Sequence, residues 1–268
     1  MLDAQPGAVL IKRSPVFPGG GGQLADRAML TWSGGTAPII GTSSGPRGVW
    51  HRFDGDAAPY GLIRIDVDRS FRNLMCELHT LAHMLNALVY TRFGGALLTG
   101  AQLSADGTFR VDFDLPGADS ERLRALEGAL NDVIASYLPV MAGFMLSEKA
   151  KEIDGMFRSN SVAPPPSEDG SVRIVEIAGL DRQACGGTHL ASTGQARPAR
   201  IVKIDNKRRQ NRRIKVAVCP PEAEAAPGLT ACVDRVIHVP TRHHGFGVAT
   251  VIGNSGKLSA AWARSANS

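Results

Sequence analysis

One long helix is the structural element that this sequence predicts most strongly. Apolar residues recur every three or four positions from Phe71 onwards, which is the period of a helix with one buried face. Gly94 and Gly95 follow the last of them and predict where the helix ends. The apolar positions are 71, 74, 75, 78, 81, 82, 85, 88 and 89. Because such a face must be covered by other elements, the rest of the chain has to pack around it.

The remaining elements predict an α+β protein. Asp119 or Ser120 is expected to cap a second helix that continues to Ile134, and a shorter helix is expected after Ser147. Strands are expected at 8–12, 28–32, 48–53, 62–67, 109–115, 172–177, 200–204 and 213–218. Residues 1–68 are interpreted as a small, glycine-rich, β-barrel-like domain, 69–218 as a second domain with an antiparallel sheet packed on helices, and 219–268 as a loosely ordered tail.

The composition favours a cytoplasmic protein. No apolar run approaches the roughly 20 residues that a membrane span needs, and the first residues include an early acid and no apolar stretch before a cleavage site. We therefore expect no membrane partner. The four cysteines, Cys76, Cys185, Cys219 and Cys232, are irregularly spaced. In a reducing compartment such cysteines are more often buried, metal-binding or catalytic than paired.

The positive charge is concentrated in one segment. The net charge is +5, yet the seven basic residues and the one acid between Lys203 and Lys215 alone give +6. A local patch of this kind is typical of a surface that binds a polyanion, although a solvated pair of strands would have the same composition. Arg212 and Arg213 are neighbours on an expected strand, so one of them should point towards packing or an internal ion pair.

Two short motifs together predict a metal site. His79 and His83 are four residues apart on the predicted helix, so both imidazoles lie on one face. Cys185 and His189 flank two glycines and a threonine, and the glycines allow the backbone to turn so that sulfur and imidazole converge. Three imidazoles and one thiolate suit tetrahedral zinc. Cys76 is a rival ligand, interpreted here as a small buried residue.

These motifs resemble a known family. The segment 77–83, Glu-Leu-His-Thr-Leu-Ala-His, is similar to the HTxxH motif of alanyl-tRNA synthetase editing domains, and residues 185–189 match the CGGTH motif of that family in full. Residues 17–23, Phe-Pro-Gly-Gly-Gly-Gly-Gln, resemble the GGGQ motif of the longer freestanding alanyl-tRNA editing proteins (AlaX type). Segments 100–102, 112–114 and 206–214 agree in order and spacing, so the resemblance spans roughly residues 10–218.

The resemblance implies a trans-editing hydrolase that removes serine, and possibly glycine, from mischarged tRNA(Ala) by zinc-assisted ester hydrolysis. It implies a tRNA partner, recognised at its acceptor end, and no DNA. The implied catalytic residues are His79, His83, Gln102 and Cys185, and the implied zinc ligands are His79, His83, Cys185 and His189. Substrate contacts are expected from Gly20, Gly21, Gly22, Gln23, Gln102 and Thr188, and tRNA contacts from Lys203, Lys207, Arg208, Arg209 and Arg212.

Some positions depart from the family pattern. Gly19 stands where many relatives carry a larger residue, Leu24 replaces a common proline, and Ala28 replaces a common glycine. These changes bear on amino-acid preference. Four protein ligands would form a closed, structural type of site, whereas a catalytic zinc keeps one position open, so both roles of the ion remain possible. Alternatives are editing of mischarged tRNA(Thr), a non-catalytic zinc-stabilised RNA-binding module, and a metal-dependent hydrolase of a small ester.

Overall fold

The structure is a computed structural model of the chain. It describes residues 1–159, 164, 167, 169–207 and 211–220, except that the side chain of Lys207 is not described. The elements of residues 1–68 are the strands β1 (Asp3–Gln5), β2 (Ala8–Ile11), β3 (Ala28–Trp32), β4 (Gly35–Gly45), β5 (Gly48–Phe53) and β6 (Arg64–Val67). Those that follow, up to residue 151, are α1 (Arg69–Arg92), β7 (Leu98–Leu103), β8 (Thr108–Asp114), α2 (Ser120–Arg124), α3 (Leu126–Ala135), β9 (Val140–Leu146) and α4 (Ser147–Lys151). The last are β10 (Ser171–Ile177), β11 (Asp181–Ala184), a 3₁₀ turn at Thr193–Gln195, β12 (Ala199–Lys207) and β13 (Asn211–Val218).

The long helix α1 confirms the periodicity prediction and extends it. The Asp68 side chain accepts a hydrogen bond from Phe71 N at 3.0 Å and caps the helix. The chain leaves the helix through Gly94 and Gly95, both with positive φ. The sequence predicts one buried face, but every residue from Met75 to Val89 is buried. The helix is therefore covered on more than its apolar side.

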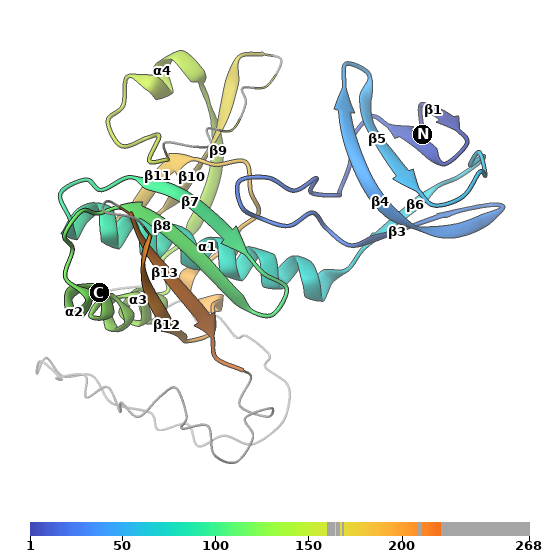
Figure 1. Cartoon of the computed structure of the whole chain (residues 1–268). Helices are drawn as coiled ribbons and strands as arrows, with labels where there is room; N and C mark the ends of the chain where they lie inside the picture. Colours follow the sequence, from blue (N-terminus) through green and yellow to red (C-terminus); the bar gives the residue numbers. More distant parts are fainter. Residues whose placement is uncertain (160–163, 165–166, 168, 208–210, 221–268) are drawn as a thin grey trace, which may run out of the picture. The chain divides into compact units, whose positions relative to one another are not determined.

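Two antiparallel sheets accompany α1. The four-stranded sheet has the order β12-β13-β8-β7 and the three-stranded sheet has the order β11-β10-β9. The first lies along α1 with α2 and α3 nearby (Figure 1). Its inner side chains, among them Phe109, Phe113 and Ile214, pack with Leu81 and Leu85 of the helix in the main core. The outer side chains of this sheet therefore face away from that core.

The N-terminal strands form an open six-stranded sheet in the order β1-β2-β5-β4-β3-β6. The β-barrel-like interpretation was wrong, because β1 and β6 would have to pair to close a barrel and they form the two opposite edges instead. This sheet has its own small core around Val9, Leu30 and Phe53.

Most of the other predicted elements are confirmed. Asp119 caps α2, and the expected second helix is divided into α2 and α3. The strands β1, β4, β7, β9 and β11 were not predicted. Asp68 is the N-cap of α1, and the division into two domains at this residue stays a prediction. Beyond Pro220, the predicted tail lies outside the described residues.

Candidate metal centre

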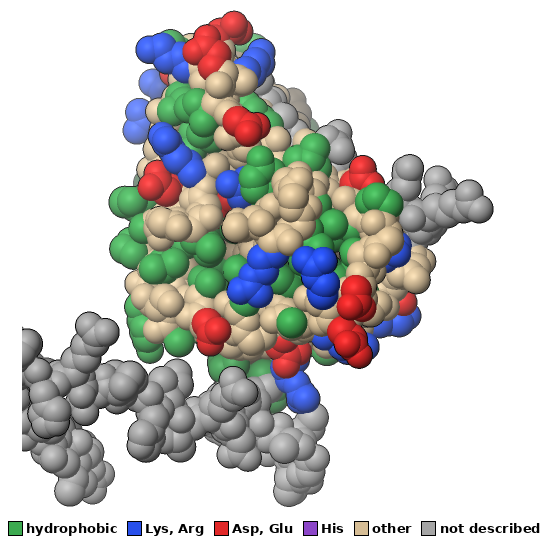
Figure 2. Space-filling view, turned by 90° about the vertical axis from the view of Figure 1, so that its left-hand side faces the viewer, with side chains coloured by type: hydrophobic (Ala, Val, Ile, Leu, Met, Phe, Trp, Pro, Cys, Tyr) green, Lys and Arg blue, Asp and Glu red, His purple; other side chains and the backbone are tan. Residues whose placement is uncertain are grey.

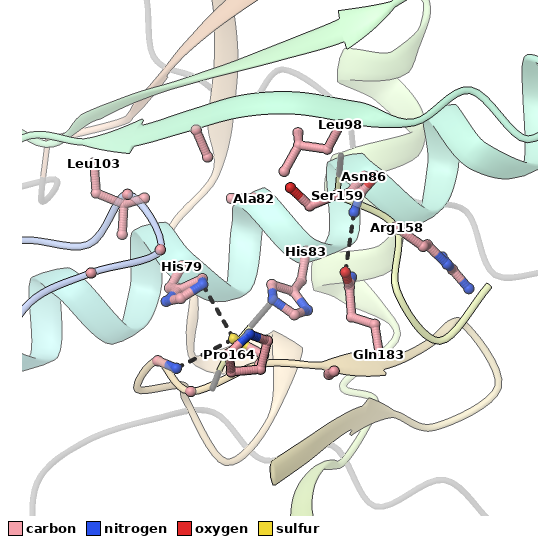
Figure 3. A pocket seen from close by; sticks show the side chains of 18 of the residues that line it. His79, Ala82, His83, Asn86, Leu98, Leu103, Arg158, Ser159, Pro164 and Gln183 are labelled. Carbon is pink, nitrogen blue, oxygen red and sulfur yellow. Dashed lines mark hydrogen bonds between the residues drawn. The ribbon is translucent and has the colours of Figure 1, made fainter. Parts of the chain in front are cut away.

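The two predicted ligand pairs converge. His79 and His83 lie one turn apart on α1, and Cys185 and His189 lie on the turn that follows β11. The four ligand atoms all lie within 4.8 Å of one another, and His79, His83 and Cys185 are buried. In Figure 3 the imidazoles of His79 and His83 point towards the sulfur from the helix above it.

The spacing of these side chains fits a tetrahedral ion. Cys185 Sγ lies 3.5 Å from His79 Nε2 and 3.4 Å from His189 Nε2. With Zn–S at about 2.3 Å and Zn–N at about 2.0–2.1 Å, a tetrahedral site places sulfur and nitrogen ligands about 3.5 Å apart. One thiolate and three imidazoles are a donor set that suits zinc. The residues therefore fit this metal both in chemistry and in spacing.

The second nitrogen of each imidazole has a partner. His79 Nδ1 lies 2.7 Å from Gln23 Oε1, and His83 Nδ1 lies 3.0 Å from Asp181 Oδ2. His189 Nδ1 lies 3.3 Å from Thr80 Oγ1. The amide and carboxylate oxygens can only accept a hydrogen bond, so they place the proton on Nδ1 and leave Nε2 free for a metal.

The other contacts of Thr80 determine which atom donates in its hydrogen bond with His189. Its hydroxyl donates to Cys76 O at 2.8 Å, and its oxygen accepts from Leu190 N at 3.0 Å. Since the single hydroxyl proton is used on Cys76, the oxygen acts as an acceptor for His189 Nδ1 as well. The threonine of the HTxxH motif thus orients His189, and a substitution that removes the hydroxyl should release this imidazole.

The surroundings of the cluster favour a thiolate. Burial raises the pKa of the Cys185 thiol, but the charges of His79 and His83 and hydrogen bonds from His189 and His79 hold this pKa well below its usual 9.0. Burial lowers the pKa of His83, yet the Cys185 thiolate and Asp181 outweigh burial and raise it to about 10. Burial and the charges of His79 and His83 lower the pKa of His189 to about 3. Cys185 is thereby held in the ionised form that binds metals.

The turn that carries Cys185 approaches α1 very closely. A Cβ atom on Gly187 would lie 2.0 Å from His79 Cε1, so only glycine fits there. Gly187 N donates to Cys185 Sγ at 3.4 Å. On the other side of the turn, Arg173 of β10 donates from one guanidinium nitrogen to Cys185 O at 2.9 Å and to Gly187 O at 2.8 Å. Arg173 was not predicted as a residue of this site, because nothing in its neighbourhood along the chain marks it.

A pocket of about 550 Å³ opens beside the cluster. His79, His83 and Cys185 line it, whereas His189 lines a second hollow near Glu77 and Arg197. The other lining residues are mostly glycine or apolar. They come from 17–22, α1, β7, β8, the segment before β10, and β11 with the turn after it; among them are Ala82, Leu98, Leu103 and Pro164 (Figure 3). The volume suits a small molecule or one end of a larger one.

Comparison with known proteins agrees with the motifs. The family described as the threonyl and alanyl tRNA synthetase second additional domain matches residues 172–215. The chain is 35% identical over 219 residues to the "Alanyl-tRNA editing protein AlaX-M" of Methanosarcina acetivorans, covering 77% of this chain and 86% of that protein. For the protein of the same name from Methanosarcina barkeri, the identity is 33% over 216 residues with the same coverage. The chain belongs to the family of alanyl-tRNA editing proteins.

A synthetase shares part of the sequence. The "Alanine--tRNA ligase" of Methanopyrus kandleri is 34% identical over 197 residues, which are 72% of this chain but 21% of the ligase. The similarity to the AlaX-M proteins thus extends over most of both chains, whereas the ligase shares only one of its regions.

Within this editing-protein fold, the GGGQ loop is tied to the CGGTH turn. Gln23 is buried, and its Oε1 also accepts from Thr188 N at 3.0 Å while its Nε2 donates to Thr188 Oγ1 at 2.8 Å. Gly20, Gly21 and Gly22 line the pocket, whereas Gln23 and Thr188 do not. The structure therefore places Gln23 and Thr188 behind His79, as a link between two motifs about 165 residues apart.

Gln102 does not line the pocket, which differs from the expectation. Successive residues of a strand face opposite sides, and here Ala101 and Leu103 face the pocket. Gln102 is exposed on the outer side of β7, where its Oε1 accepts from Arg110 Nε and Nη2 at 3.1 and 2.9 Å. A direct contact between Gln102 and a molecule in the pocket has no support in this geometry.

The basic segment is partly paired. Arg213 donates to both oxygens of Asp112 at 2.7 Å, which confirms that one of the two neighbouring arginines makes an ion pair. Arg212 Nε is buried, and Lys203 is exposed beside Asp205 at 3.0 Å. Arg208, Arg209 and the Lys207 side chain lie outside the described residues. In the face that Figure 2 draws, basic side chains are interspersed with acidic and apolar ones.

Among the described residues, no helix is both long and apolar enough to cross a bilayer.

Proposed function

We propose that this protein hydrolyses the ester of mischarged tRNA(Ala), releasing serine and possibly glycine, with zinc held by His79, His83, Cys185 and His189. The observation that carries the proposal is the wall that three of these side chains form in a pocket of about 550 Å³. This chemistry agrees with the name of the AlaX-M relatives, which are alanyl-tRNA editing proteins.

The need for such a reaction has a physical origin. A synthetase pocket built for the methyl group of alanine cannot exclude the smaller glycine, and an added hydroxyl changes binding by only about 1–3 kcal/mol. A second, hydrolytic site corrects the errors that binding alone leaves. The ester between an amino acid and a ribose is already activated, so that positioning of water and stabilisation of one oxyanion provide much of the required acceleration.

The residues have distinct tasks in this reaction. A bound zinc ion supplies Lewis-acid polarisation of an oxygen, or a water of lowered pKa. The substrate ester approaches the side of the cluster formed by His79, His83 and Cys185, because these three line the pocket. Gln23, Asp181 and Thr80 hold the imidazoles in the tautomer that presents Nε2. The glycine loop 19–22 lets backbone approach the ligand closely.

The tRNA body lies outside the pocket in this proposal. Lys203, Lys207, Arg208, Arg209 and Arg212 remain candidates for contacts with phosphates near the acceptor end, which are independent of sequence and sensitive to salt. Arg212 is the weakest of them, since its Nε atom is buried.

The test is deacylation of three substrates by the purified protein: Ser-tRNA(Ala), Gly-tRNA(Ala) and Ser-tRNA(Thr). We expect hydrolysis of the first, and a loss of about 10²–10³-fold or more in the Cys185→Ala variant, the size of effect seen when one stabilising group is removed. Preference for Ser-tRNA(Thr) would indicate the other editing specificity. Tight tRNA binding without hydrolysis of any substrate would leave only a zinc-stabilised RNA-binding module.

A further inference from the structure

The four-stranded sheet carries a row of basic side chains on its outer face. Lys203 of β12 pairs in register with Lys215 of β13, and Lys215 pairs with Arg110 of β8. Gln102 of β7 is the partner of Arg110 on the other side. Directly paired residues point to the same face. Lys203, Lys215 and Gln102 are exposed and Arg110 is half-buried, while their neighbours Phe109, Val111, Ile214 and Val216 are buried on the inner face.

This row is unfavourable for the stability of the sheet. Like charges directly opposite each other on neighbouring strands destabilise the pairing. The next row along the same strands has the opposite arrangement, because Asp205, Arg213 and Asp112 alternate in sign. Ion pairs with the acids of this second row offset the repulsion only in part, and a feature that costs stability in this way is expected where a surface has a function.

Two of the three bases of the row are paired with acids, and the third is not. Arg110 is held by Gln102 Oε1 and by Asp112 at 2.7 Å, and Lys203 is paired with Asp205. Lys215 is exposed and has no ion pair within 4.0 Å among the described residues, although its charge helps to lower the pKa of Asp106 in the turn before β8. Across both rows, four basic side chains face two acidic ones, so this outer face keeps a net charge of about +2 at neutral pH.

The row begins at the wall of the pocket. β7 is an edge strand of its sheet, and it carries Gln102 outwards and Ala101 and Leu103 into the pocket. Strands lie about 4.8 Å apart, so the four positions span about 14 Å, which is long enough to contact several phosphates of one strand. A chain whose end enters the pocket can therefore continue over this face.

We propose that the outer face of the sheet β12-β13-β8-β7 is an RNA-binding surface, on which Lys203, Lys215 and Arg110 contact phosphates of the tRNA next to its acceptor end. Gln102 and Asp112 position the guanidinium of Arg110. The inference rests on the proposed function, in which tRNA is the substrate, and it assigns Gln102 a place outside the pocket.

The test measures binding of the full-length protein to an uncharged tRNA(Ala) transcript at several salt concentrations, which keeps the reaction out of the readout. The variants are Lys215→Thr, Arg110→Gln and the double variant. Arg64→Gln is the matched control, because Arg64 is an exposed strand residue on β6, and it loses the same charge. Each phosphate contact contributes about one to the slope of log affinity against log salt. We expect the slope to fall by about one in each single variant, by about two in the double variant, and not at all in the control.

Thermal unfolding separates this role from a structural one. Lys215→Thr should unfold at the same temperature as the wild type or higher, because it removes like-charge repulsion, while it weakens RNA binding. Wild-type binding and slope in the double variant would overturn the proposal, even with deacylation intact. A wild-type protein that binds tRNA through these residues but hydrolyses nothing would support the surface and refute the proposed reaction.

Discussion

His83 Nδ1 lies 3.0 Å from Asp181 Oδ2, although 98 residues separate the two side chains in the sequence. Asp181 is itself buried and surrounded by donors: Gln183 Nε2 lies 2.7 Å from the same oxygen, and Arg158 Nη1 lies 2.7 Å from the other. Oδ2 thus accepts hydrogen bonds while Oδ1 makes an ion pair with Arg158 and no hydrogen bond, and these charges and hydrogen bonds hold the pKa of Asp181 below its usual value despite burial. The carboxylate is the element that fixes the ring of His83.

An Asp181→Asn variant should bind zinc about 10–100-fold more weakly, the usual cost of losing an outer partner of a metal ligand. An asparagine must turn its NH₂ group towards one of the existing donors, so it cannot satisfy them all. Competition with a chelator of known affinity measures the loss. Glu176→Gln is the control, since Glu176 makes an exposed ion pair with Arg182 on the same sheet. Equal zinc affinity in both variants would contradict this role.

Thr80→Val should lower both stability and metal affinity. The substitution keeps the volume of the side chain but leaves the half-buried Leu190 N–H and His189 Nδ1 without their acceptor. An unsatisfied buried polar group costs about 1–3 kcal/mol, and for these half-buried groups we expect a loss near the lower end of that range. Thr80→Ser keeps the hydroxyl and is the matched control. The free energy of unfolding, measured with denaturant, and the zinc affinity, measured by chelator competition, should both be lower in Thr80→Val than in Thr80→Ser. Equal values in the two variants would show that the hydroxyl does not orient His189.

Gly187→Ala should abolish the metal site. The added Cβ would lie 2.0 and 2.3 Å from two atoms of the His79 ring and 2.9 Å from Gln23 Oε1, so either the ring or the turn must move. Gly186→Ala is a close control, because its Cβ would meet only Pro164 Cβ, at 3.7 Å. Absorption of the cobalt-substituted protein reports the geometry of the site. We expect the spectrum of the thiolate-bound ion in Gly186→Ala and its loss in Gly187→Ala.

His51 should make the N-terminal sheet sensitive to acid. Its side chain is fully buried, with Nδ1 3.1 Å from Val49 O and Nε2 2.6 Å from Ser14 Oγ. Burial lowers its pKa from 6.5, so the unfolded chain takes up the proton first as the pH falls. The free energy of unfolding should be fully retained above about pH 6.5 and decline below it. Between pH 8 and pH 5, the unfolding temperature should fall less in His51→Gln than in the wild type. Parallel curves for the two proteins would show that His51 does not cause the acid sensitivity.

The sequence predicted the elements whose patterns are local. The apolar period of α1 and the Asp119 cap are read from neighbouring residues, and the structure confirms both. β4 was missed because glycine, serine and threonine dominate it and no alternation marks its eleven residues. β9 was missed because its apolar residues are continuous, and most of them are exposed. Apolar and polar residues alternate along a strand only where one face of the strand is buried and the other is exposed to water.

The four residues that could hold a metal ion were accessible from sequence for a different reason. Their chemistry is rare enough that two pairs with metal-ligand spacing predict a single site. The partners of these ligands are common residues whose roles depend on contacts between distant segments, as for Gln23 with Thr188 and Asp181 with His83. Gln102 was misplaced for the same reason. The family resemblance put its side chain in the pocket, but side chains alternate along β7 and that of Gln102 points outwards to Arg110.

Arg173 should be required to keep the metal-binding turn in place. Cys185 N donates to Arg173 O at 3.0 Å, and the guanidinium of Arg173 holds the carbonyl oxygens of Cys185 and Gly187. The turn contains two adjacent glycines, whose backbone freedom would otherwise let it sample other conformations. A planar guanidinium with a fixed array of donors suits this task better than a flexible ammonium.

Arg173→Met should therefore increase hydrogen exchange of the amides at 185–189 and weaken zinc binding about 10–100-fold. Arg173→Lys should restore part of both, because its ammonium still donates to one carbonyl. Arg182→Met is the control, since Arg182 is a half-exposed arginine on the neighbouring strand β11. Exchange needs neither metal nor tRNA, so it tests the position of the turn independently of catalysis. Unchanged exchange at the turn in Arg173→Met would show that the two glycines hold their conformation without the arginine.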